Sequence, residues 1–115
     1  MGRLTTHVLD TANGIPAAGV DVRAYRLGSE RQHVASAVTN VDGRTEKPLL
    51  ADEAFTDGEY ELEFDVGAYF DAFGTAPGNT PFLGTVIVRV QVDASQHYHV
   101  PLLTSPWSYS TYRGS

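Results

Sequence analysis

The residues best suited to chemistry gather at the end of the chain. His97 and His99 lie two positions apart in His-Tyr-His-Val, an alternation that predicts a β-strand with both imidazoles on one face. Tyr112 and Arg113 follow close to the C-terminus. Chain ends are usually polar and poorly ordered. An end that carries imidazoles, a phenol, a guanidinium and the terminal carboxylate predicts a functional site there.

Two further candidates precede this stretch. His7 lies in a strand-like segment that is otherwise apolar or hydroxylic, and Arg44 directly follows the turn-forming residues Asn40–Gly43. Taken one at a time, each has an ordinary alternative. His7 is then a core or edge histidine, Arg44 a surface turn residue and Tyr112 a strand aromatic. These alternatives stay open on the residues alone.

Metal and nucleophile motifs are absent from the sequence. A lone His-x-His pair lacks a third ligand at a characteristic spacing, so no metal is predicted and no cofactor is expected. There are no cysteines, which excludes disulfides and cysteine nucleophiles. The sequence contains no Gly-x-Ser-x-Gly elbow, phosphate loop or His-Glu-x-x-His helix.

Composition limits the partners. The net charge is −6, from 14 acidic and 8 basic residues without a basic run, which argues against nucleic acid. No apolar run approaches the ~20 residues of a membrane span, so we expect no membrane partner and a cytoplasmic location. A length of 115 residues fits a single domain over 1–115.

Short strands separated by turns dominate the pattern. Residues 59–65 alternate most clearly, with Tyr60, Leu62 and Phe64 predicted inward and the glutamates in water. A short helix is predicted over 66–73, capped by Asp65 and ended by Gly74, with Tyr69, Phe70 and Phe73 as its apolar stripe. Segment 45–55 is irregular, with a helical turn near 52–55, and 75–81 is a loop. The other strands are predicted over 4–10, 20–27, about 33–39, 85–92, from 97 until Ser105-Pro106, and 108–112. Seven or eight short strands with one helix indicate an all-β fold, an antiparallel β-sandwich.

Several segments together resemble the 5-hydroxyisourate hydrolases, the transthyretin-like enzymes of urate breakdown. The resemblance runs from about Leu4 to Ser115, and the closing Tyr-Arg-Gly-Ser is its most specific part. The segments that carry it are Leu-Thr-Thr-His-Val-Leu-Asp (4–10), Thr-Asn-Val-Asp-Gly-Arg (39–44), Phe-Asp-Val-Gly-Ala-Tyr-Phe (64–70), His-Tyr-His-Val-Pro-Leu-Leu (97–103) and Tyr-Ser-Thr-Tyr-Arg-Gly-Ser (109–115).

The resemblance implies a fold, an assembly and a site. The fold is a transthyretin-like antiparallel sandwich of about eight strands with one short helix. It dimerises edge to edge and stacks as a dimer of dimers, a homotetramer with its active sites in the central channel. The implied catalytic residues are His7, Arg44, His99 and Tyr112, and the implied substrate-binding residues are His7, Arg44, Tyr112, Arg113, Gly114 and Ser115. His97 matches less securely than His99.

The resemblance also implies the reaction. 5-Hydroxyisourate is hydrolysed to 2-oxo-4-hydroxy-4-carboxy-5-ureidoimidazoline, with water activated by histidine and the substrate oxygens stabilised by arginine. Which histidine is the base stays open. The main alternative is a transthyretin-type carrier that binds a hydrophobic ligand in the tetramer channel. A third hypothesis is a protein-interaction module without enzymatic activity, which does not explain the candidate His, Arg and Tyr residues.

Overall fold

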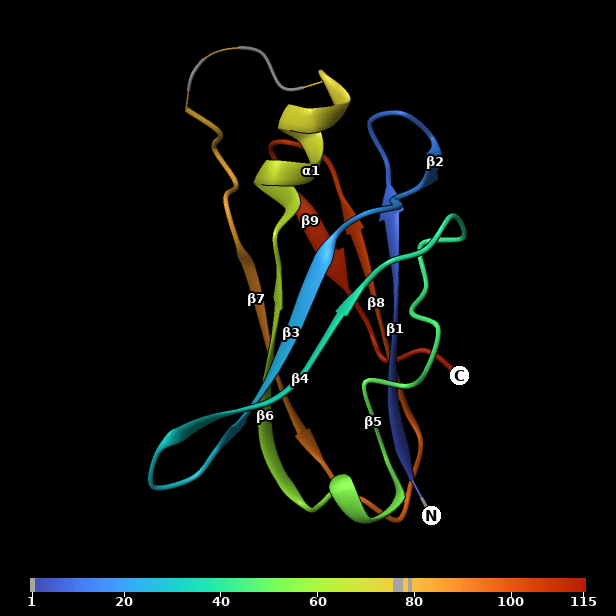
Figure 1. Ribbon diagram of the computed structural model, residues 1–115, viewed down its shortest axis with the longest axis vertical. Helices are drawn as coiled ribbons and strands as arrows, with labels where there is room; N and C mark the ends of the chain where they lie inside the picture. Colours follow the sequence, from blue (N-terminus) through green and yellow to red (C-terminus); the bar gives the residue numbers. More distant parts are fainter. Residues whose placement is uncertain (1, 76–77, 79) are drawn as a thin grey trace.

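The computed structural model describes residues 2–75, 78 and 80–115, and within them the strands form two sheets packed face to face (Figure 1). One sheet has the order β2-β1-β8-β9, with β5 also paired to β1, and the other has the order β4-β3-β6-β7. The strands are β1 (Arg3–Asp10), β2 (Ile15–Pro16), β3 (Asp21–Leu27), β4 (Arg31–Val38), β5 (Leu50–Ala51), β6 (Gly58–Phe64), β7 (Val86–Val92), β8 (Tyr98–Thr104) and β9 (Tyr109–Thr111). The predicted all-β sandwich with one short helix is confirmed, with the two-residue strands β2 and β5 in addition.

One strand pair departs from the antiparallel prediction. β1 and β8 run parallel, in a register from Leu4 opposite Tyr98 to Asp10 opposite Thr104. The first strand and the penultimate one are therefore neighbours at the centre of their sheet, as Figure 1 shows. Alternation within each strand predicts which side chains share a face, but not which strands lie side by side.

The core lies between the sheets. Tyr60, Leu62 and Phe64 of β6 are fully buried, as their alternation predicts. The prediction for the glutamates of β6 was wrong, because Glu61 is only 8% exposed. Its carboxylate accepts hydrogen bonds from the guanidinium groups of Arg31 on β4 and Arg89 on β7. These two arginines lower the pKa of the Glu61 carboxyl.

The helix α1 spans Val66–Phe73, as predicted, and Gly74 ends it in the left-handed conformation with φ 81°. Asp65 precedes it but makes no side-chain cap, so that part of the prediction was wrong. Its carboxylate instead accepts two hydrogen bonds from Arg23 of β3, which lower its pKa. The apolar stripe is also shorter than predicted, because Phe73 is 49% exposed.

Two short secondary-structure elements lie in a segment that was predicted to be irregular. The segment expected to be irregular contains β5 and a 3-10 helix, η1, at Asp52–Ala54. The loop predicted over 75–81 includes residues 76, 77 and 79, which lie outside the described residues. At the end of the chain, β8 begins at Tyr98, so His97 lies just before the strand. In the described part of the chain, no helix is long and apolar enough to cross a membrane.

Candidate active site

The outer face of the β1–β8 pair carries the candidate histidines. Buried residues alternate along β1 with partly exposed ones, so Thr5 and His7 share the face that points away from the core. The parallel register sets His99 opposite Thr5 and Pro101 opposite His7. Residues separated by more than 90 positions thus meet on one surface because the first and penultimate strands are neighbours.

A tight turn brings Arg44 to the same surface. The Asn40 side chain accepts hydrogen bonds from the backbone N–H groups of Asp42 and Arg44, at 2.9 and 3.2 Å. Gly43 has φ 78°, and its carbonyl oxygen accepts a 2.7 Å hydrogen bond from the N–H of Val8. A Cβ at Gly43 would lie 2.3 Å from the Val8 oxygen, so only glycine allows this approach.

The turn also orients the ring of His7. Arg44 forms an isolated β-bridge with His7, and Nε2 of His7 lies 2.8 Å from the backbone oxygen of Asp42. A carbonyl oxygen only accepts hydrogen bonds, so Nε2 carries the proton in this contact. In the neutral ring, Nδ1 then holds the lone pair that can accept a proton.

His99 is held by its strand neighbour. Its Nδ1 lies 2.8 Å from the hydroxyl oxygen of Thr5. Burial lowers the pKa of the His99 imidazole from its ordinary value of 6.5, and electrostatic repulsion by the Arg44 charge and by the nearby His7 lowers it further. His99 is therefore neutral at neutral pH, the form in which an imidazole accepts a proton.

The C-terminal residues divide into two groups. Gly114 forms a β-bridge with His99 and donates a 2.7 Å hydrogen bond from its N–H to the His99 carbonyl. A Cβ on Gly114 would lie 2.6 Å from Cδ2 of the His99 ring. The absence of a side chain therefore lets the tail cover one edge of the imidazole. Ser115 follows directly and is exposed.

Tyr112 and Arg113 lie beside a different hollow of about 310 Å³, which β7 and β8 also line. The Arg113 guanidinium stacks 4.1 Å from the ring centre of Tyr98 and donates to the His97 carbonyl at 3.0 Å. Tyr112 is 60% exposed. Within one chain the structure thus gathers His7, Arg44, His99 and Gly114, and places these two side chains apart from them.

A cavity of about 260 Å³ opens beside His99. Arg44 lines it as well, together with groups that the sequence analysis did not single out. Arg3 continues the outer-face row of Thr5 and His7 on β1, and this alternation was a usable signal for it. The lining residues are Arg3, Thr5, Thr6, Arg44, Thr45, Glu46, Lys47, Pro48 and His99.

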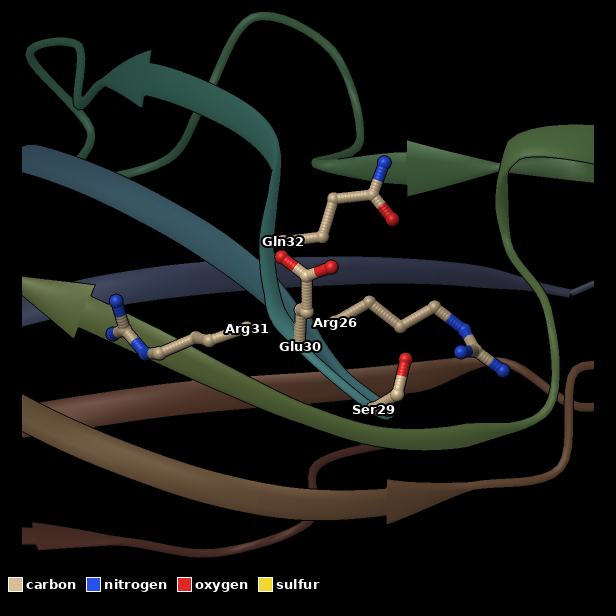
Figure 2. Close-up of a pocket in the computed structure, with 6 residues that line it drawn as sticks. Arg26, Ser29, Glu30, Arg31 and Gln32 are labelled. Carbon is tan, nitrogen blue, oxygen red and sulfur yellow. The ribbon is translucent and has the colours of Figure 1, made fainter.

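A wider hollow, of about 450 Å³, lies at the hairpin between β3 and β4 (Figure 2). It contains none of the predicted site residues. Its arginines already have partners, since Arg26 donates to the Thr56 hydroxyl and the Asp57 carbonyl. Arg31 binds two glutamates and stacks on Tyr25. The chemistry therefore points to the cavity beside His99 and not to this hairpin.

No group of three His, Cys, Asp or Glu side chains is placed to hold a metal ion among residues 2–75, 78 and 80–115. The two histidines of this set can accept protons, and Arg44 supplies a fixed positive charge. The Gly114 backbone packs against the His99 ring. Such a set can activate water and stabilise negative charge on an oxygen.

The sequence is similar to those of known proteins. The chain is 56% identical to a 5-hydroxyisourate hydrolase of Deinococcus radiodurans, over 97% of this chain and 95% of the relative. It is 54% identical to a 5-hydroxyisourate hydrolase of Mesorhizobium japonicum, over 99% of this chain and 93% of the relative.

The fold is similar to those of solved structures. The structure of Klebsiella pneumoniae 5-hydroxyisourate hydrolase matches with a TM-score of 0.83 and 34% identity, over the full length of both chains. The crystal structure of (S)-allantoin synthase matches with a TM-score of 0.93 and 48% identity, over 99% of this chain and 44% of that one. This chain therefore spans less than half of that larger protein. The model of the HIUase/Transthyretin family matches residues 4–114, and the chain belongs to that family.

Proposed function

We propose that this protein hydrolyses 5-hydroxyisourate to 2-oxo-4-hydroxy-4-carboxy-5-ureidoimidazoline, a step of urate degradation. The observation that carries the proposal is the convergence of His7, Arg44, His99 and Gly114 on one surface, through the two β-bridges His7–Arg44 and His99–Gly114. The similarity to relatives named for this reaction, over nearly their whole length, supports the same activity.

The reaction opens a ring at an acyl–nitrogen bond. The oxygen of a water molecule bonds to the acyl carbon, and the bond from that carbon to the ring nitrogen breaks. One proton of the water passes to a basic group of the protein and the other stays on the new carboxyl group until it ionises. The departing nitrogen takes up a proton. Catalysis therefore needs a base, an acid and stabilisation of the transient oxyanion.

The two histidines supply the proton transfers in this proposal. His99 has a lowered pKa, so its neutral ring is available to take a proton from water. His7 has its Nε2 bound to the Asp42 carbonyl, which leaves Nδ1 for the reaction. Either ring can act as the base, and the other, two residues along on the same face of the paired strands, is then the candidate acid for the departing nitrogen.

Arg44 and the tail complete the site. The Arg44 guanidinium is planar and always charged, which suits a two-pronged contact with carbonyl oxygens. Gly114 leaves room beside the His99 ring. We assign Tyr112, Arg113 and Ser115 to substrate contacts made by the tail once subunits have assembled, because the first two lie apart from His99 in a single chain.

The proposed assembly is a homotetramer, a dimer of dimers. Trp107, Tyr109 and Tyr112 are 57%, 46% and 60% exposed, which is unusual for large aromatic side chains clustered in one segment. Among the described residues, β7 and β9 are the outermost strands at one side of their sheets, so each presents a backbone edge that can pair with another chain. An assembly would bury these aromatic side chains and pair these strand edges between subunits, and their exposure in the single chain supports the proposal.

An ultraviolet assay tests the activity. 5-Hydroxyisourate is generated in situ from urate by urate oxidase, and its absorbance decay is followed with and without the protein. We expect faster decay with the protein, and a loss on the order of 10²–10⁴-fold in the His99→Ala variant. A decay rate unchanged by the wild-type protein would refute the proposed function.

A further inference from the structure

The basic residues of this chain divide sharply by their contacts. Arg23, Arg31 and Arg89 form ion pairs with carboxylates. Arg26 and Arg113 donate hydrogen bonds to neutral oxygens. The remaining three make no side-chain hydrogen bond or ion pair with another described residue, and all three line the cavity beside His99. They are Arg3, Arg44 and Lys47.

The backbone holds these three residues at fixed places. Arg3 pairs with Ala51 of β5, and the N–H of Leu49 donates a 2.9 Å hydrogen bond to the Leu4 carbonyl. The segment from Arg44 to β5 therefore runs back along the start of β1. This path brings Lys47, the only lysine of the chain, into the lining of the cavity that Arg3 also lines.

The cavity is electropositive in an acidic protein. Glu46 is the only carboxylate among its lining residues in the described part of the chain, against three positive side chains. The whole chain has a net charge of −6. A concentration of positive charge at a cavity raises the local concentration of anions and speeds their arrival. Arg44 is assigned to the oxygens at the reacting bond. Arg3 and Lys47 have no role in that step, so their positive charges are available for another part of the ligand.

We infer that Arg3 and Lys47 form an anion-recognition subsite at the mouth of this cavity, which selects planar heterocyclic anions over neutral rings. The inference deepens the proposed function, since it rests on this cavity being the place where the heterocyclic substrate binds. Arg3 and Lys47 contact or attract the negatively charged edge of the ligand, while Arg44 and the histidines face the bond that breaks. They are specificity residues.

Equilibrium binding tests the subsite without turnover. The probes are urate, an anion at neutral pH, and hypoxanthine, a neutral purine of similar shape, each titrated into the full-length protein and followed by NMR. We expect the wild type to prefer urate. Arg3→Gln and Lys47→Gln should each weaken urate binding about 3-fold, the size of one exposed charge interaction, and the double variant about 10-fold. Hypoxanthine binding should not change.

Two further variants provide the controls. Glu46→Gln removes the negative charge of the rim and should strengthen urate binding. Arg26→Gln makes the same charge change as Arg3→Gln, but at the distant β3–β4 hairpin, and should leave urate binding unchanged (Figure 2). Thermal melting checks that each variant is folded, as we expect for Arg3, Glu46 and Lys47 because they are exposed.

Kinetics give the second readout. kcat/KM for 5-hydroxyisourate should fall as ionic strength rises, and this salt dependence should be weaker in the double variant, with kcat nearly unchanged. The inference is overturned if wild-type protein fails to bind urate, if the double variant binds urate as wild type does, or if both purines lose affinity equally. An inactive wild type that still prefers urate through Arg3 and Lys47 would refute the proposed reaction and keep the subsite.

Discussion

The hydroxyl oxygen of Thr5 lies 2.8 Å from Nδ1 of His99, across the parallel strands β1 and β8. The contact decides which ring nitrogen of His99 is available. If Nδ1–H donates to Thr5, the lone pair is on Nε2, the nitrogen next to the Cδ2 edge that Gly114 covers. Thr5 is thus a positioning residue for His99.

A pair of substitutions tests this role. Thr5→Val keeps the shape of the side chain and removes the hydroxyl, so kcat should fall roughly 5-fold, the equivalent of a net hydrogen bond of about 1 kcal/mol. Thr5→Ser restores the hydroxyl and should recover most of the loss. Nitrogen chemical shifts of His99 should report a changed tautomer in the valine variant alone. Equal kcat in both variants contradicts the role.

The pH dependence follows from the environment of His99. Burial and the charge of Arg44 disfavour the imidazolium, so the pKa of His99 lies below its ordinary 6.5. The neutral ring therefore persists as the pH falls through 6.5, and kcat/KM should decline only at lower pH if His99 is the base. An acid limb at or above that value would assign the base to another group.

Arg44→Gln tests the electrostatic cause separately from activity. Removing the positive charge beside His99 removes one of the effects that lower its pKa, so NMR titration should show the His99 pKa moving upward. Turnover should fall as well, because a neutral amide cannot replace the guanidinium contact. A His99 pKa that stays in place would show that Arg44 is not among its causes, which would leave burial and His7.

Gly114→Ala probes the closeness of the tail to the His99 ring. The new Cβ would lie 2.6 Å from Cδ2 of His99, so either the ring or the tail must move. We expect at least a 10-fold loss of kcat with little change in Tm, since Gly114 lies next to the chain end. Gly28→Ala is the matched control, because its Cβ meets only Arg26 Nη1, at 3.6 Å. Wild-type turnover in the Gly114 variant contradicts this account.

Chelation tests the expectation that no metal takes part. Extended treatment with a strong chelator should leave kcat and KM unchanged, because histidine and arginine groups supply every proposed step. Loss of activity that one particular divalent ion restores would contradict the metal-independent mechanism.

Local structure was largely predictable from the sequence. The alternation of β6 predicted its buried face, and the residues from Asp65 to Gly74 predicted the bounds of α1. The turn at Gly43 was also evident, since Asn, Asp and Gly are typical of turns. These patterns depend on interactions between near neighbours in the chain.

Long-range pairing was not predictable in the same way. The Glu61 carboxylate of β6 is paired by Arg31, which reaches it from β4 on the far side of β3, and by Arg89 of the neighbouring strand β7, and no local pattern shows that meeting. Phe73 is the last residue of α1 and is half exposed, although the helical period places it on the stripe of Tyr69 and Phe70. Lys47 joins the cavity only because β5 pairs with β1. The resemblance predicted the candidate histidines and the alternation of β1 offered a signal for Arg3, while Lys47 needed the structure.

The parallel pairing of β1 with β8 also bears on how the protein becomes active during folding. Thr5 and His99 are 94 positions apart, so their contact requires closure of nearly the whole chain. Contacts this distant form slowly in β proteins. A growing polypeptide cannot form this contact until β8 has been synthesised and has docked beside β1. If the proposed site is the active one, a chain in which β8 has not docked lacks the Thr5–His99 contact, and we expect it to be inert toward the reactive heterocycle.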